Sequence, residues 1–282
     1  MSDALRTLIE ALERDDALAE PTRLRERIEA LDRLDAWMPV AGKWMPRAQA
    51  IQRKLEAANA TEYEAVRLAI RQGRGREAMR HRWRDGDGAA SVRGDAYDWL
   101  DEWVAGVLPH GTPAEAEALP PEMVFYQPTP ARHVFDLLDR LQLGEHDTLV
   151  DLGAGLGHVP LLAAICSDAR GLGIEIEHAY VESTRRCARD LHLANAHFVR
   201  GDAREADFGI GSVFYLYTPF TGTILREVLD ALRCEAARRT FRVCSFGPCT
   251  AVLAAESWLA ADDEPRSDRV AIFRAQRPSS PR

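Results

Sequence analysis

The chain has 282 residues, of which 46% are hydrophobic, and a formal net charge of −8 at neutral pH. This length allows one large α/β domain with a smaller companion, and the acidic balance argues against a general nucleic-acid binder. We expect a cytoplasmic protein without a membrane anchor, because the sequence lacks an apolar run of about 18 residues and begins with acids instead of a basic signal peptide.

The first third of the chain has the hydrophobic spacing of amphipathic helices. Leu5, Leu8, Ile9 and Leu12 recur at helical intervals, and a second helical pattern of leucines and isoleucines follows Pro21. Residues 47–71 and 97–108 predict two further helices. Because no segment before residue 120 alternates as a strand does, we expect an all-α N-terminal domain.

Charge and composition place the expected domain boundary. Basic residues dominate residues 43–84 and acidic residues dominate 85–122, while the stretch HGTPAEAEALPPE over 110–122 has the composition of a linker. The sequence therefore predicts an N-terminal helical domain over 1–117 and a second domain over 118–282.

From residue 148 onward, predicted strands alternate with predicted helices. This alternation predicts an α/β fold with a doubly wound, mostly parallel sheet. The expected strands are 148–151, 171–176, 196–200, 212–217, 240–245 and 270–275. The expected helices are 158–166, 179–192, 222–233 and 250–258.

A glycine-rich turn follows the first predicted strand. The stretch DLGAGLG places Asp151 at the strand end and Gly153, Gly155 and Gly157 in the turn. Ligands of such sheets lie beyond the carboxyl ends of the strands, where glycine lets the backbone approach closely. The spacing G-x-G-x-G departs from the G-x-G-x-x-G of NAD-binding proteins, which disfavours a dehydrogenase. A tight turn without a ligand is the alternative interpretation.

This turn resembles the first motif of the class I S-adenosylmethionine (SAM) methyltransferases, which have a seven-stranded, Rossmann-like sheet. The resemblance covers about residues 125–276 and implies SAM as the cofactor. It implies that Glu175, at the end of the second strand, binds the ribose hydroxyls, and that Asp202 and Ala203 bind the adenine. A solvent-exposed strand end for Glu175 and a helix cap for Asp202 are the alternatives.

The segment VFYQPTPARHVFDLLDRL, just before the first strand, predicts a loop that leads into a helix. It is similar, more loosely, to the cofactor-covering segment of the non-SET histone lysine methyltransferases. That resemblance implies that Tyr126 and Thr129 approach the methionine part of SAM. Interdomain packing is the alternative role for Tyr126.

The fourth strand ends in FYLYTPF, where the methyltransferase family places the loop beside the transferred methyl group. We therefore expect Tyr217, Thr218 and Phe220 to line the transfer site. This loop lacks the Asn or Asp that precedes Pro-Pro-aromatic in adenine and glutamine methyltransferases, and it departs from the histone enzymes. We expect no metal, because the five cysteines form neither a CxxC pair nor a cluster with zinc-ligand spacing.

The sequence thus predicts a SAM-dependent methyltransferase acting on a small molecule, with the N-terminal helices capping the site or presenting the substrate. A protein lysine methyltransferase and a SAM-binding interaction module without catalysis are the alternatives. We interpret His133 and His158 as structural. We interpret the segment GREAMRHRWR as a solvated helix face with Trp83 turned inward, and contact with an acidic substrate is its alternative role.

Overall fold

The computed structural model describes residues 2–85, 92–111 and 122–277. The chain divides into two compact units. The first contains residues 1–69 and 97–108, and the second contains residues 70–96 and 109–282. Every helix of the described residues is too short or too polar to span a bilayer.

The first unit is helical, as expected. Its helices are α1 (Ser2–Arg14), α2 (Leu24–Asp35), α3 (Met45–Arg71, through residue 69) and α5 (Trp99–Val107). Leu5, Ile9, Leu34 and Leu55 lie in its core. Arg27 is fully buried there, and its guanidinium donates to Asn59 and to two backbone carbonyls, so its charge is held by oxygen acceptors.

The second unit contains a sheet of seven strands within the described residues, in the order β3-β2-β1-β4-β5-β7-β6. Strands β1 to β5 run parallel, and β7 and β6 are antiparallel to their neighbours. The strands are β1 (Thr148–Leu152), β2 (Arg170–Glu175), β3 (Ala196–Arg200), β4 (Val213–Tyr217), β5 (Arg242–Phe246), β6 (Leu259–Ala261) and β7 (Ala271–Ala275). The α/β prediction with a mostly parallel sheet is confirmed.

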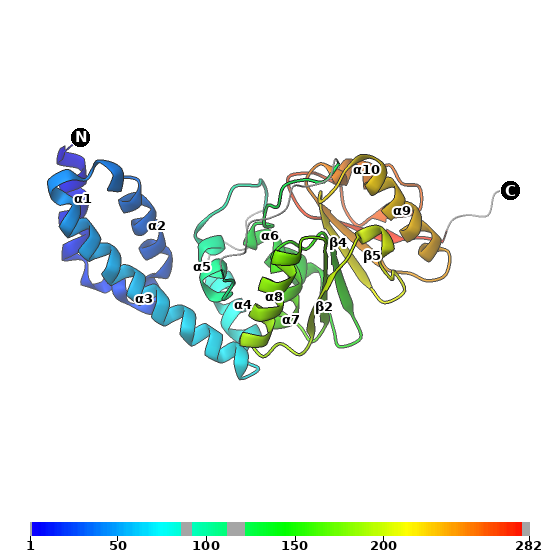
Figure 1. The fold of residues 1–282 in the computed structure, drawn as a ribbon, viewed down its shortest axis with the longest axis horizontal. Coiled ribbons are helices and arrows are strands. Elements are labelled where there is room, and N and C mark those ends of the chain that lie inside the picture. Colours follow the sequence, from blue (N-terminus) through cyan, green and yellow to red (C-terminus); the bar gives the residue numbers. More distant parts are fainter. Residues whose placement is uncertain (1, 86–91, 112–121, 278–282) are drawn as a thin grey trace. The chain divides into compact units, whose positions relative to one another are not determined.

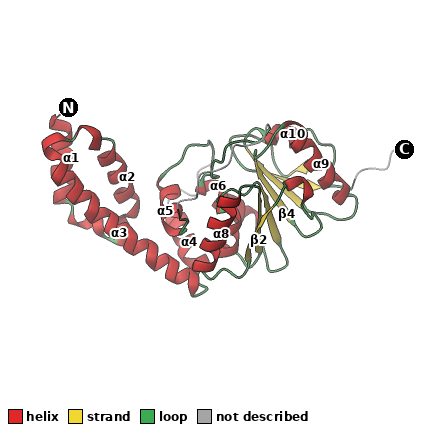
Figure 2. Ribbon diagram, viewed as in Figure 1, coloured by secondary structure: helices red, strands yellow, loops and turns green. Residues whose placement is uncertain are grey.

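Helices cover both faces of this sheet, with α8 on one side and α9 on the other (Figures 1 and 2). The helices are α4 (Gly75–Asp85), α6 (Ala131–Leu141), α7 (His158–Cys166), α8 (His178–Asp190), α9 (Gly222–Ala236) and α10 (Cys249–Ala254). The strands β1, β4 and β5 are almost completely buried, as expected for a parallel sheet between two helix layers.

Two predictions near the carboxyl end of the chain were wrong. The helix expected over 250–258 ends at Ala254, and it is followed by β6, where no strand was expected. Trp258 is buried beside the sheet, so its apolar side chain extended an apparent helical pattern beyond the true helix end.

The division into units differs from the boundary expected at residue 118, which lies outside the described residues. Helix α4 belongs to the second unit, where Trp83 stacks on Phe135 at 5.5 Å and donates to Asp139. The inward orientation expected for Trp83 is confirmed. The composition of a sequence can indicate a linker, but it does not show to which unit a helix belongs. For α4, the side-chain contacts with α6 and α7 determine this. The role expected for the N-terminal helices stays a prediction.

Candidate active site

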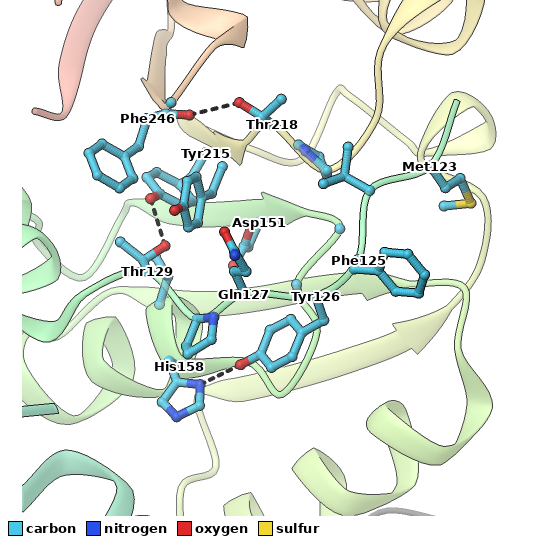
Figure 3. A pocket seen from close by; sticks show the side chains of 18 of the residues that line it. Met123, Phe125, Tyr126, Gln127, Thr129, Asp151, His158, Tyr215, Thr218 and Phe246 are labelled. Carbon is cyan, nitrogen blue, oxygen red and sulfur yellow. Dashed lines mark hydrogen bonds between the residues drawn. The ribbon is translucent and has the colours of Figure 1, made fainter. Parts of the chain in front are cut away.

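A cavity of about 1170 Å³ lies at the carboxyl ends of the parallel strands in the second unit. Its lining includes residues that follow β1, β2, β4 and β5, together with the segment ahead of α6. Figure 3 shows side chains from these segments converging on Asp151. Parallel strands all end at the same edge of a sheet, so residues distant in sequence meet there.

Asp151 is the most deeply buried acid of this cavity. The residue is 5% exposed, and its carboxyl has no hydrogen-bond partner among the described residues. Burial, and then the charge of Glu175, raises the pKa of Asp151 well above its usual value. An isolated buried carboxylate is costly, so this site favours a ligand that brings a positive charge or hydrogen-bond donors.

The glycine turn has left-handed backbone conformations at Gly153, Gly155 and Gly157, with φ of 86°, 53° and 67°. A Cβ at Gly153 would lie 2.3 Å from Pro219, and one at Gly155 would lie 2.0 Å from the ring of Tyr126. The spaces left by these glycines are therefore filled by protein atoms. Only Gly153 of the three lines the large cavity, together with Ala154.

Glu175 ties the glycine turn to the next strand. Its carboxylate accepts hydrogen bonds from the backbone amides of Gly155, at 2.7 Å, and Glu177, at 2.8 Å. A carboxylate has about four lone-pair positions, so two remain for further donors. Glu175 lines the cavity, and its binding of ribose hydroxyls stays a prediction.

Asp202 lies at a second, smaller cavity that adjoins the first through Gly153 and Glu175. Its side chain caps the short 3-10 helix Ala203–Glu205 and forms an ion pair with Arg204 at 2.7 Å. The hydrogen bond from Arg204 is the main cause that holds the pKa of Asp202 below its usual value. Asp202 therefore caps the short helix and also lies beside the candidate cofactor pocket.

Tyr126 and Thr129 both line the large cavity, and each forms a side-chain hydrogen bond with another residue of the lining. The hydroxyl groups of Thr129 and Tyr215 are 2.8 Å apart, and the Tyr126 hydroxyl lies 2.9 Å from Nδ1 of His158 (Figure 3). Tyr126 therefore packs within the second unit, over the glycine turn.

The loop after β4 contributes Tyr217 and Thr218, but not Phe220, to the lining of the large cavity. Tyr217 lines the cavity and packs against Phe246, with ring centroids 4.7 Å apart. Thr218 has a φ of 39°, and its hydroxyl donates to the carbonyl of Phe246 and accepts from the amide of Cys249. The Thr218 hydroxyl therefore stabilises the backbone after β4 and β5. Phe220 is 1% exposed and lines only the smaller cavity, so its side chain does not reach the large one.

Several residues of the cavity were not predicted from the sequence, among them Phe246 at the end of β5 and Tyr180 on α8. Asp95, in the segment before α5, also lines the cavity and raises the pKa of Tyr217, after burial. The position of Phe246 at a strand end is the signal that could have indicated it. Asp95 could not be predicted, because only the tertiary fold brings it to the cavity. The side chains of Arg132 and His133 form hydrogen bonds with the backbone carbonyl of the preceding residue, Gly94.

Residues 123–204 match the family model "Histone methylation protein DOT1". No curated protein matches the chain. Among solved structures, the chain is similar to an RNA methyltransferase from Salinibacter ruber in complex with S-adenosyl-L-homocysteine, with 28% identity over 55% of this chain and 97% of that chain and a TM-score of 0.45.

Two further solved structures with lower identity are also similar to part of this chain. One is a precorrin-6y C5,15-methyltransferase from Geobacter metallireducens, with 18% identity over 55% of this chain and 93% of that chain and a TM-score of 0.42. The other is a geranyl diphosphate C-methyltransferase from Streptomyces coelicolor, with 19% identity, 42% and 44% coverage and a TM-score of 0.35. Because these alignments are partial, we assign the fold from the strand order itself.

The seven-stranded sheet and the match over residues 123–204 agree with both resemblances stated from the sequence. The matched segment contains Tyr126, Asp151, Glu175 and Asp202. The resemblance to class I SAM-dependent methyltransferases, and the looser one to the histone methylation family, are therefore confirmed.

Proposed function

We propose that this chain is a SAM-dependent methyltransferase that binds SAM across the carboxyl ends of β1, β2 and β3. One observation carries this proposal. The segment that matches a methyltransferase family model, residues 123–204, supplies Tyr126, Asp151 and Glu175 to one cavity and Asp202 to the cavity that adjoins it.

The residues of the two cavities fit the parts of SAM in order along the sheet edge. The buried carboxyl of Asp151 suits the ammonium group of the methionine part, beside Tyr126 and Thr129. Glu175 has lone pairs for the ribose hydroxyls. The smaller cavity has an acid, Asp202, and apolar walls that suit the adenine, which gives Phe220 a packing role there.

The large cavity has room for an acceptor as well as the methionine end of SAM. Its volume of about 1170 Å³ lies above the ~300–1000 Å³ of typical small-molecule sites. Tyr217 and Phe246 line it with aromatic faces that can hold a cationic or planar group. We therefore propose a small molecule as the acceptor, with Tyr217 in contact with it and Thr218 holding the loop.

Bound SAM supplies an electrophilic methyl group with a good leaving group. The protein's task is then to align donor and acceptor and to exclude water. The described residues of the cavity do this with Tyr217, Phe246 and the segment around Tyr126, and the proposal requires no dedicated base.

Transfer of radiolabelled methyl groups tests this function. Purified protein is incubated with labelled SAM and cell extract, which is then separated into small-molecule, protein and RNA fractions. We expect label in the small-molecule fraction, and we expect Asp151→Asn, an isosteric change, to reduce it at least tenfold. Retained SAM binding with no label in any fraction would favour the non-catalytic binding module instead.

A protein lysine acceptor is the second candidate, and the DOT1 model match favours it. Label in the protein fraction, recovered as methyl-lysine after hydrolysis, would support this candidate over the first. The expectation that nucleic acid is not the acceptor gains no support from the comparisons, because one similar protein is an RNA methyltransferase. Label sensitive to ribonuclease would contradict both candidates.

A further inference from the structure

The segment over residues 122–129, here called the strap, crosses the candidate active site and is tied at both ends. Near its start, the amide of Val124 donates to the carbonyl of Pro219 at 3.1 Å. At its end, the hydroxyl groups of Thr129 and Tyr215 are 2.8 Å apart. These two hydrogen bonds join the strap to β4 and to the loop that follows β4. The residues between Val124 and Thr129 are held by a different contact.

Tyr126 provides a side-chain anchor in the middle of the strap. Its hydroxyl lies 2.9 Å from Nδ1 of His158, the first residue of α7 (Figure 3). Its ring covers the face of Gly155 on which a Cβ would lie, and it packs at 5.3 Å from the ring of Tyr180. Tyr126, His158 and Tyr180 all line the large cavity, so this anchor lies within the site.

The His158 ring is uncharged at neutral pH. Burial, and then the nearby His110, lowers the pKa of His158 to about 3, and the two rings lie 5.2 Å apart. No carboxylate bonds to His158 within the described residues. The hydrogen bond with Tyr126 therefore joins two neutral groups, and a hydrogen bond of this kind can break and re-form without moving a charge.

We propose that His158 is a positioning residue whose hydrogen bond with Tyr126 holds the strap over bound SAM and so slows release of the cofactor. This proposal rests on the proposed function and assigns His158 a role that acts through Tyr126. The glycine at position 155 is then needed because the Tyr126 ring occupies the space of its missing side chain.

The dissociation rate of S-adenosylhomocysteine (SAH), measured by stopped flow, tests this role. Tyr126→Phe removes only the hydroxyl oxygen, and His158→Leu removes the ring nitrogen. Because a neutral hydrogen bond contributes modestly, we expect each variant to release SAH about 3- to 10-fold faster. The double variant is expected to be no faster than the faster single variant, because both changes remove the same bond.

A conservative variant separates positioning from simple packing. His158→Asn places an amide at nearly the position of Nδ1, where it can bond to Tyr126 in either direction, so it is expected to restore the slow release. His197→Asn, at an exposed histidine on β3, is the matched control and is expected to behave as the unaltered protein.

Unchanged rates in Tyr126→Phe and His158→Leu would overturn the proposal, as would equal rates in the Leu and Asn variants. Independent, multiplying effects in the double variant would also overturn it. If His158→Leu does not fold, Tyr126→Phe and His158→Asn still decide the matter. Failure of the unaltered protein to bind SAH would instead contradict the proposed function.

Discussion

Asp151 and Glu175 place two carboxyl groups at the ends of neighbouring strands, and their environments differ. Glu175 is stabilised by two backbone amides, whereas Asp151 is buried without a hydrogen-bond partner among the described residues. The sequence predicted both positions, because each residue lies at the carboxyl end of a predicted strand. The pairs Tyr126–His158 and Thr129–Tyr215 could not be predicted, because they join segments that only the tertiary fold brings together.

The raised pKa of Asp151 predicts a pH dependence of cofactor binding. The ammonium group of SAH favours the ionised carboxylate, while the free protein retains the proton at lower pH. We therefore expect SAH affinity to rise with pH and to level off above the pKa of Asp151 in the free protein. Calorimetric titrations at a series of pH values at which the protein stays folded measure it.

Asp151→Asn serves as the comparison in the same titrations. Loss of one charged hydrogen bond is expected to lower the affinity by about 10- to 100-fold and to remove the pH dependence. An identical pH profile in this variant would show that another group causes it.

Thr218 combines an unfavourable backbone conformation with two buried hydrogen bonds. We expect Thr218→Val, which has the same shape but lacks the hydroxyl, to lower the free energy of unfolding by about 1–3 kcal/mol, because the amide of Cys249 loses its acceptor. Thr218→Ser keeps the hydroxyl and is the control. Equal stability of the Val and Ser variants in urea unfolding would refute this account.

Among the elements, those with strong periodicity were predicted closely. The strand at Ala196–Arg200 and the helix at His158–Cys166 begin and end at the expected residues. The strand β6 was missed because Leu259–Ala261 is short, rich in alanine and defined by antiparallel pairing with β7. Pairing between distant segments leaves no periodic signal in so short a stretch.

The packing of α7 on β2 predicts that one glycine is essential for stability. A Cβ at Gly171 would lie 2.2 Å from the backbone carbonyl oxygen of Pro160. We expect Gly171→Ala to lower the free energy of unfolding by about 1–3 kcal/mol or more, because this helix must move away from the sheet.

Gly144→Ala is the matched control, since nothing lies within 4 Å of its added Cβ. It is expected to change stability by less than about 0.5 kcal/mol in the same urea experiment. A Gly171 variant as stable as the Gly144 variant would contradict the close packing of α7 on β2.

For the whole molecule, composition indicated a helical part and an α/β part, but it did not indicate which unit α4 joins. The side chains that decide this, Trp83 and Phe135, meet from helices that are far apart in sequence. Buried histidines in the second unit also link stability to pH. Burial lowers the pKa of His110 to about 4, and burial and His110 lower that of His158 to about 3.

These histidines are expected to make the protein sensitive to acid. Below pH 6.5 these histidines take up protons in the unfolded chain but not in the folded protein, so they lower the free energy of unfolding as pH falls. The raised pKa of Asp151 contributes a smaller slope of opposite sign, because there are two such histidines and one such carboxyl. Each histidine contributes up to about 1.4 kcal/mol per pH unit between pH 6.5 and its folded pKa. Urea unfolding at pH 6.5 and about pH 5 measures the slope.

His110→Phe tests the origin of this slope. Both ring nitrogens of His110 are buried without a hydrogen-bond partner within the described residues, so the apolar ring is expected to preserve stability at neutral pH. At about pH 5 the variant should be more stable than the unaltered protein. An unchanged slope would show that other groups cause the acid sensitivity.

Calorimetric titration of the full chain with SAH and, separately, with NAD tests the central claim most directly. The account predicts binding of SAH with a Kd on the order of micromolar and no binding of NAD. It places the ammonium group of SAH, which NAD lacks, beside Asp151, and the G-x-G-x-G spacing departs from that of NAD-binding proteins. Binding of NAD alone, or of neither compound, would contradict it.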